Sequence, residues 1–541
     1  MDRHSSEATL SWARDAIGDR LLDYLLAADF DLAASRAMDP AQLSGKRAEV
    51  VDTLAALRNE LPSELDEAGE AQALRHWLMQ SEDDQRSIAR ALREHVLWDN
   101  VPGGADEVEN ALIGVAMDAY PALLLPPEPL PFETPFREDV NSLLSVVVYH
   151  RSREFTDAAF RDPRLSAIFP DQGDPVASMV TYKSNTRLGT SLQLVMLPSL
   201  VIRAAWREIQ DDPPTVTDFT AKVAEHFRVM CGVLTGETHS AVAKLAFTGV
   251  LLPGDVPLKF GNATVRPILD ADRRNVPESL KGQLTGQDGS GVDVTVNYDG
   301  DVVLEYQFPY KVRLNEDLSD PWSSGNEMRP PVDIERTAVR LRFALMLAVD
   351  RIPRAQLIHT WTTFDEPLGV PSSISWSDPR KGSGFMPTQL TEQDVEEWGK
   401  WYARLDTVHV NRIELALSRI LRAMAERRDP SDVLIDSVIA WENLFGTSQG
   451  EPTFRVTMCL AKLLEDAVDD RKTLKAKLGK IYELRSKVVH GSRNLKPEDY
   501  PLCQEALDVA IRAVRVLVLD RTDILELSDG APRSVSLLLG D

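Results

Sequence analysis

Residues 472–491, KTLKAKLGKIYELRSKVVHG, decide the fold that the sequence predicts for its C-terminal region. The hydrophobic residues on one face of this stretch are Leu474, Leu478, Ile481 and Val488. Their spacing predicts an amphipathic helix over residues 472–490. At about 100° per residue, Arg485 falls in the middle of the same face, so its side chain is expected to point toward a helical bundle or a partner subunit.

The segments on either side of this helix also have helical patterns. They cover residues 391–427, 453–467 and 499–520. After the first of them, Asp429 can cap another helix, Pro430 suits its first position and Gly446 can end it. Helices with such short connections predict an all-α bundle over residues 390–525, followed by a C-terminal tail at 526–541.

The rest of the chain is predicted to form two further regions of an α+β multidomain protein. Residues 1–125 carry helical patterns and form a helical N-terminal region. The proline-rich segment 126–131 cannot continue a helix and marks a boundary. Residues 136–385 mix helices with strands and form a mixed α/β region, which we expect to have a sensor or regulatory role. The Pro, Gly and Ser-rich stretch 367–388 marks its end.

Antiparallel strands are expected in the middle region. Residues 292–296, VDVTV, alternate between apolar and polar types, and the strand-favouring residues 302–306, VVLEY, follow on the other side of Asp299-Gly300. Because glycine tolerates the positive φ that tight turns require, this pattern predicts a β-hairpin.

The composition is typical of a globular protein, with 43% hydrophobic and 27% charged residues. No apolar run reaches the roughly 18 residues that a membrane span needs, and residues 1–20 lack the apolar core of a signal peptide. The cysteines Cys231, Cys459 and Cys503 are far apart and form no CxxC pair. We therefore expect a cytoplasmic protein that contacts no membrane and has no cofactor and no metal site.

The charge is unevenly distributed along the chain. The whole sequence carries a formal net charge of −24, which disfavours nucleic-acid binding by the protein as a whole. Between Arg471 and Lys496, however, nine basic residues accompany the single acid Glu483, a local charge of +8. This basic window is either a solvated helix face or an RNA-binding surface.

An arginine and a histidine five residues apart, Arg485 and His490, carry the chemistry that the sequence suggests. A histidine that titrates near neutrality can take the proton of a ribose 2′-OH or protonate the leaving 5′-oxygen, and a guanidinium can hold the phosphate. The two side chains point about 140° apart on a regular helix. Either the helix end unwinds at Gly491, or the two side chains line a cleft from different sides.

The spacing alone is not specific, because other pairs in the chain have it. They are Arg90/His95, Arg354/His359 and Arg404/His409. The pair Arg485/His490 differs from them in its place within the predicted bundle, in its basic surroundings and in the glycine that follows it.

The segment LRSKVVHG at residues 484–491, together with IAWENLF at 439–445, resembles the HEPN ribonuclease superfamily and is similar to its Apea-like branch. The resemblance implies metal-independent endoribonuclease activity with Arg485 and His490 as catalytic residues. In that family the position after the arginine is often polar, and here it is Ser486. The resemblance further implies a homodimer or higher oligomer assembled through the HEPN-like domain. It also implies a toxin or antiphage-defence effector. From the arrangement of the chain, we expect the residues before about 390 to regulate this effector in response to an unknown trigger.

Glu442 is expected to support the site, because it lies on an apolar face of its own helix and an unpaired charge there would be costly. The residues expected to bind the RNA substrate are Lys480, Lys487 and Arg493. An internal salt bridge between Arg485 and Glu442 is the alternative explanation of both residues. The corresponding alternative function is a non-catalytic HEPN scaffold, or an RNA- or nucleotide-binding dimerisation module.

Overall fold

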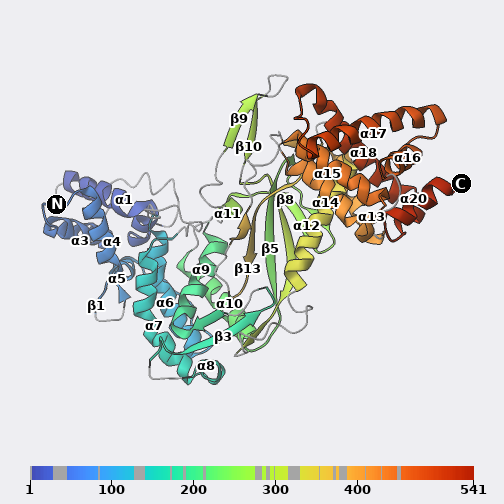
Figure 1. Cartoon of the computed structure of the whole chain (residues 1–541). Helices are drawn as coiled ribbons and strands as arrows, with labels where there is room; N and C mark the ends of the chain where they lie inside the picture. Colours follow the sequence, from blue (N-terminus) through green and yellow to red (C-terminus); the bar gives the residue numbers. More distant parts are fainter. Residues whose placement is uncertain are drawn as a thin grey trace. The chain divides into compact units, whose positions relative to one another are not determined.

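The protein is a helix-rich α+β protein whose chain forms two compact units (Figure 1). The computed structural model describes residues 3–28, 45–82, 86–126, 140–170, 174–186, 190–210, 215–273, 283–287, 293–297, 299–314, 329–351, 354–368, 373–376, 387–408, 410–427, 429–447 and 452–540. The first unit comprises Met1–Ala241, Phe308–Pro330 and Asp365–Ser372. The second comprises Val242–Gln307, Pro331–Phe364 and Ser373–Asp541.

The first unit is mainly helical. Its helices are α1 (Arg3–Leu25), α3 (Lys46–Glu60), α4 (Glu67–Met79), α5 (Ile88–Val96), α6 (Glu107–Leu124), α7 (Leu143–Arg161), α8 (Pro163–Ile168), α9 (Leu197–Ile209) and α10 (Val216–Leu234). Its strands are β1 (Ser81–Glu82), β2 (Arg86–Ser87), β3 (Met179–Ser184), β4 (Thr190–Gln193) and β12 (Val312–Leu314). Strand β3 lies between β4 and β12 and pairs with both in the antiparallel sense.

Helix α6 forms the core of the first unit and buries a charge there. The Asp118 carboxylate is fully buried and pairs with Arg151 at 2.8 Å and with Arg90 at 3.4 Å. The backbone N–H of Ser87 donates a third bond to it, at 3.2 Å. These partners supply the compensation that a buried carboxylate requires.

A six-stranded sheet lies mostly within the second unit. Its order is β14 (Ser373–Trp376), β13 (Ile358–Asp365), β5 (His239–Thr248), β11 (Val302–Tyr310), β8 (Ala263–Pro267) and β7 (Leu258–Phe260). Strands β11, β8 and β7 are antiparallel neighbours. Ala246, Val303 and Trp361 form a fully buried cluster in this sheet.

The predicted β-hairpin across Asp299-Gly300 is wrong, although both of its strands exist. Strand β10 (Asp293–Asn297) pairs with β9 (Gln283–Gln287), whereas β11 pairs with β8. The Asp-Gly pair is a corner between two sheets, with Gly300 at φ +119°. The corner is fixed by the Asp301 carboxylate, which accepts bonds from Thr248 Oγ1 at 2.6 Å and from the N–H of Gly249 at 2.9 Å.

The second unit also contains two short strands that pair in parallel, β6 (Val250–Leu251) and β15 (Thr388–Gln389). Its other elements in the described part of the chain include a series of helices. They are α11 (Asp270–Arg273), α12 (Arg329–Ala348), α13 (Glu392–Thr407), α14 (Glu414–Ala425), α15 (Pro430–Phe445), α16 (Pro452–Leu464), α17 (Val468–Val489), α18 (Tyr500–Leu519), α19 (Thr522–Leu525) and α20 (Gly530–Leu539). The caps predicted for α15 are confirmed, since Asp429 accepts from Ser431 N and Gly446 ends the helix. The long pattern over 391–427 is divided into α13, a 3₁₀ turn at Val410–Ile413, and α14.

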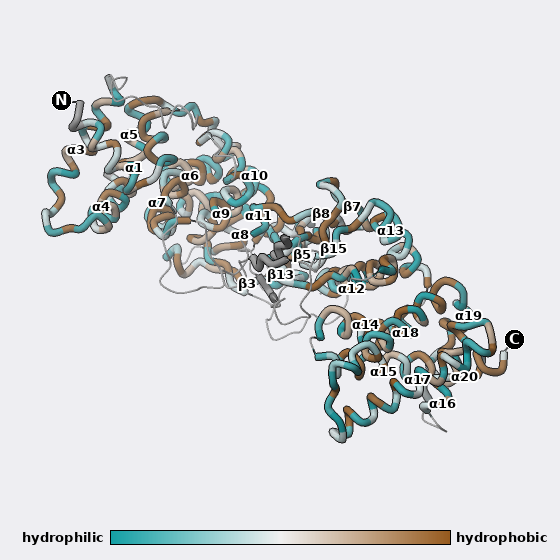
Figure 2. Tube along the Cα trace, turned by 90° about the horizontal axis from the view of Figure 1, so that it is seen from above, coloured by the Kyte–Doolittle hydropathy of each residue, from teal (hydrophilic) through white to brown (hydrophobic). Residues whose placement is uncertain are grey.

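Helix α15 is the central helix of this C-terminal bundle. It packs against α14, α16, α17, α18 and α20. Its Trp441 side chain is fully buried, and the indole N–H donates to the carbonyl of Ala506 in α18 at 3.2 Å. Hydrophilic and hydrophobic residues alternate along these helices (Figure 2), as expected when each buries one face.

Residues 526–541, expected as a tail, contain helix α20, which packs on α15 and α16. Most of the predicted boundary segments 126–131 and 367–388 lie outside the described residues. The division of the chain into the three predicted regions therefore stays a prediction. None of the helices that the structure describes is long and apolar enough to span a membrane.

Replacing Gly300 by alanine should lower the free energy of unfolding by about 1–3 kcal/mol, because alanine is strained at this positive φ. The added Cβ would also lie 3.2 Å from the Cβ of Ala246. Chemical denaturation of the full chain measures this effect. Gly254→Ala is the control, since a Cβ there meets no atom within 4 Å. Equal unfolding midpoints for the two variants would contradict the corner described above.

Candidate functional site

Helix α17 holds the predicted catalytic pair and ends in a well-formed C-cap. Gly491 has φ +66° and its N–H donates to the carbonyl of Val488 at 3.0 Å. The N–H of Ser492 donates to the carbonyl of Lys487 at 3.0 Å. These two bonds form a Schellman motif, which satisfies the last carbonyls of the helix. The helix therefore does not unwind before His490, whose exposed side chain lies at the cap position.

The structure brings Arg485 and Glu442 together, as the sequence suggested. A guanidinium nitrogen of Arg485, Nη2, lies 3.8 Å from Glu442 Oε2. The two side chains are 22% and 34% exposed, so this is a loose, partly solvated ion pair. Its contribution to stability is expected to be at most about 1 kcal/mol, below that of a fully buried pair.

Tyr482 joins the same cluster from the preceding turn of α17. Its hydroxyl donates a hydrogen bond to Glu442 Oε1. Burial, followed by the interaction with the Glu442 carboxylate, raises the pKa of Tyr482 above its usual value, so the phenol stays a neutral donor. The Nε atom of Arg485 is buried and has no hydrogen-bond partner among the described residues. At least one N–H group of Arg485 is therefore not bound by any acceptor among the described residues.

The structure does not place Arg485 and His490 on one face. With α17 regular to Val489, the two residues are separated by about 7.5 Å along the axis and by about 140° around it. The backbone N–H of His490 donates to the carbonyl of Ser486 at 3.1 Å, which makes Ser486 part of the last helical turn. Of the two geometries left open by the sequence, the unwound helix end is wrong. The other, in which the two side chains line a cleft from different sides, stays a prediction.

Most basic residues of the window 471–496 have partners. Lys487 pairs with Glu483 at 2.6 Å, and one nitrogen of Arg493 donates to both carboxylate oxygens of Asp499 at 2.7 and 2.8 Å. Lys480 is exposed. The net positive field of this helix is therefore smaller than its sequence suggests, because neighbouring acids neutralise several of its cations.

The other R-x4-H pairs differ from Arg485/His490 in how firmly their arginines are held. Arg90 forms ion pairs of 2.8 and 3.4 Å with two carboxylates. Arg354 forms ion pairs of 2.7 and 3.4 Å with two carboxylates. Arg404 donates to the carbonyls that end α18. These arginines are held by contacts of 3.4 Å or less, whereas the ion pair of Arg485 is 3.8 Å long.

Of the histidines in those pairs, the two that the structure describes are held in other environments. His95 pairs with Glu49 at 2.6 Å. His359 lies in strand β13, and burial, assisted by the nearby Arg342 charge, lowers its pKa to about 4. His359 therefore stays neutral at physiological pH. His409 lies outside the described residues.

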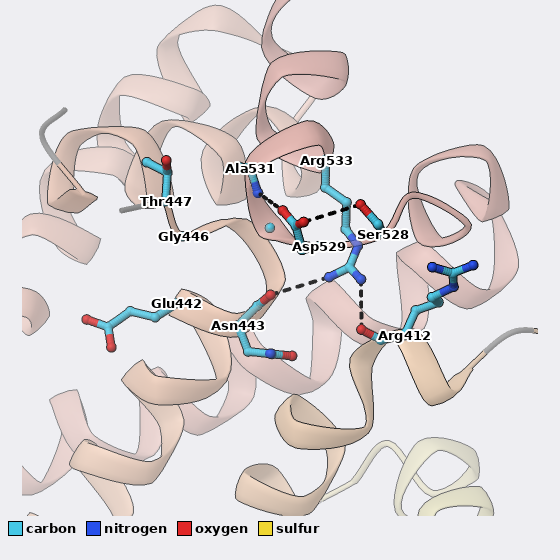
Figure 3. A pocket seen from close by; sticks show the side chains of 10 residues that line it. Arg412, Glu442, Asn443, Gly446, Thr447, Ser528, Asp529, Ala531 and Arg533 are labelled. Carbon is cyan, nitrogen blue, oxygen red and sulfur yellow. Dashed lines mark hydrogen bonds between the residues drawn. The ribbon is translucent and has the colours of Figure 1, made fainter. Parts of the chain in front are cut away.

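A pocket with a volume of about 510 Å³ opens beside Glu442 (Figure 3). Its lining residues are Arg412, Glu442, Asn443, Gly446, Thr447, Ser528, Asp529, Gly530, Ala531 and Arg533. Glu442 and Asn443 extend in different directions from the last turn of α15 (Figure 3). The wall that α20 supplies was not predicted from the sequence, although Asp529 before Gly530 is a recognisable N-cap signal for that helix.

Arg533 lines this pocket and holds together the backbone segments around it. It is fully buried and donates to the carbonyls of Asn443 at 3.3 Å, Arg412 at 2.7 Å and Leu527 at 3.2 Å. Burial lowers its pKa below the usual range of arginine. Because its donors are directed at backbone carbonyls, including those at the C-terminal end of α15, it fixes the backbone next to Glu442.

Among the residues that the structure describes, no group of three or more His, Cys, Asp or Glu side chains is arranged to hold a metal ion. Comparison of the chain with protein-family models, with curated proteins and with solved structures finds no match.

The two glycines of α17 should respond to alanine in opposite ways. Gly491→Ala places a side chain at φ +66° and should lower the free energy of unfolding by about 1–2 kcal/mol. Gly479→Ala, in the helix interior with no atom within 4 Å of the new Cβ, should raise it by about 0.5–1 kcal/mol. Thermal unfolding of both variants checks this. Stabilisation by Gly491→Ala would show that the described end of α17 is wrong.

Proposed function

We propose that the C-terminal bundle cleaves RNA without a metal ion, with Arg485 and His490 as the catalytic residues. Arg485 binds the scissile phosphate and stabilises the charge that develops on it. His490 takes the proton of the 2′-OH or protonates the leaving 5′-oxygen. Attack of the 2′-oxygen on phosphorus then releases a 5′-OH strand and leaves a 2′,3′-cyclic phosphate. DNA lacks the attacking hydroxyl and is not cleaved.

One observation carries the proposal. Arg485 differs from the arginines of the other R-x4-H pairs. Its charged partner lies 3.8 Å away, and its buried Nε has no hydrogen-bond partner among the described residues. An arginine with donors to spare beside an exposed histidine suits a ligand that supplies several acceptor oxygens, as a phosphate does. The pocket beside Glu442 offers room for part of a nucleotide.

A second candidate function is a HEPN-like scaffold without catalysis, and the ion pairs of α17 favour it. Lys477 pairs with Glu505 at 2.8 Å, and Lys487 and Arg493 are paired as well. A surface neutralised in this way attracts RNA less strongly. Exposed ion pairs are worth about 1 kcal/mol or less, however, so a phosphate can replace the acidic partners.

We further propose that the active form is a homodimer or higher oligomer, assembled through the bundle. Val489, next to His490, is 46% exposed, and such a residue can contact a second copy. In this proposal residues 1–385 sense a trigger and control the bundle. The protein then acts as a toxin or antiphage-defence effector, because the RNA damage that it causes arrests growth. The cytoplasmic location follows from the same role.

His490→Ala should lower the rate of RNA cleavage by about a hundredfold or more in buffer that contains EDTA, because a proton-transfer group is lost. Its free energy of unfolding should change by less than about 1 kcal/mol, since the side chain is exposed at a helix end. The measurement is cleavage of a labelled RNA, together with growth of cells that overexpress the protein. His95→Ala, an exposed histidine of a decoy pair, is the matched control and should keep full activity.

Two results would refute this function. One is full cleavage and growth arrest by a folded His490→Ala protein, which would leave the scaffold as the better account. The other is cleavage that EDTA abolishes and a divalent cation restores.

A further inference from the structure

We infer that Glu442 is a displaceable counter-ion for Arg485. Its carboxylate occupies the position that an RNA phosphate would take beside Arg485, and it thereby sets the substrate affinity of the site. This inference rests on the proposed function. A group that supports Arg485 would strengthen RNA binding, whereas Glu442 in this role weakens it by competing with the phosphate. Removal of its charge should then strengthen RNA binding.

The length of the Arg485–Glu442 contact supports displacement. At 3.8 Å the two groups attract each other but form no hydrogen bond. In the same bundle, arginine–carboxylate pairs that join helices are shorter, such as Arg419–Asp436 and Arg512–Glu465 at 2.7 and 3.1 Å. A phosphate oxygen that approaches within hydrogen-bonding distance would therefore bind the guanidinium more closely than Glu442 does.

Tyr482 explains why the carboxylate stays back from the arginine. Its hydroxyl donates a hydrogen bond to Glu442 Oε1, and Tyr482 is a buried residue of the bundle, 8% exposed. Only Oε2 is left to face Arg485. Tyr482 thus positions Glu442 where its charge offsets that of Arg485 while the guanidinium keeps unused donors.

The pocket beside Glu442 can accommodate its carboxylate after a phosphate has displaced it from Arg485. Glu442 is 34% exposed and lines the pocket together with Asn443 and Thr447. The Asn443 side-chain oxygen accepts from the N–H of Ala416 at 3.2 Å, which leaves its amide nitrogen as a donor in the pocket lining. A rotation of the Glu442 side chain therefore moves the charge from Arg485 into a polar, solvated space, with no change in the backbone that Arg533 fixes.

The test uses the full chain and a fluorescent 2′-O-methyl RNA, which binds but cannot be cleaved through the 2′-oxygen. Glu442→Gln keeps the shape of the side chain and an acceptor for Tyr482 but removes the charge. It should bind this probe roughly threefold to tenfold more tightly than the wild type in an anisotropy titration. With cleavable RNA, KM should fall by the same factor while kcat changes by less than about twofold.

Two controls separate this effect from a general loss of negative charge. Glu505→Gln removes a carboxylate from Lys477 of the same helix and should change affinity by less than about twofold. In an Arg485→Gln background, Glu442→Gln should give no gain, because the gain acts through Arg485. A gain that persists in that background would overturn the inference.

Unchanged or weaker binding by Glu442→Gln would also overturn it and would make Glu442 a support for Arg485. If the wild type cleaves RNA through His490 while Glu442→Gln shows no gain, only the inference fails. If the wild type neither binds the probe nor cleaves RNA, the proposed function fails and the inference with it.

Discussion

The burial of Trp441 is the constraint on which the C-terminal bundle depends. Its side chain is fully buried in α15, and its indole N–H bonds to the carbonyl of Ala506 in α18. Because residues on a helix are fixed relative to one another, this anchor determines where the next residue, Glu442, leaves the core. Glu442 consequently meets Tyr482 and Arg485 of α17 at the edge of the bundle. The candidate site is therefore set by the packing of an apolar residue.

Helix α20 completes this arrangement from the end of the chain. A Cβ on its first residue, Gly530, would lie 2.6 Å from the carbonyl oxygen of Gly446, so α20 begins against the end of α15. Arg533 then donates to carbonyls on both sides of this contact. The pocket and the backbone beside Glu442 thus depend on residues about ninety positions later in the chain. The bundle holds Arg485 with a weak partner while it holds Arg533 firmly, and only the former has donors left for a ligand.

Local signals in the sequence predicted the limits of helices and one contact between two of them, but not which strands pair. Asp429, Pro430 and Gly446 fixed the limits of α15 because caps act within one turn. The Arg485–Glu442 contact followed from two apolar faces that each carried one charge. The hairpin at Asp299-Gly300 failed because turn residues report backbone geometry, whereas the choice of β9 as the partner of β10 depends on the rest of the fold. The neutralisation of Arg493 by Asp499 likewise requires the path of the loop after α17.

The chemical identity of the RNA ends tests the central claim most directly. In the proposed reaction, His490 transfers a proton and Arg485 binds the phosphate while the 2′-oxygen of the same strand attacks. Mass spectrometry of the products formed by the full-length protein in EDTA should then find a 2′,3′-cyclic phosphate on one fragment and a 5′-OH on the other. Products with a 3′-OH and a 5′-phosphate would require attack by water and would contradict the account.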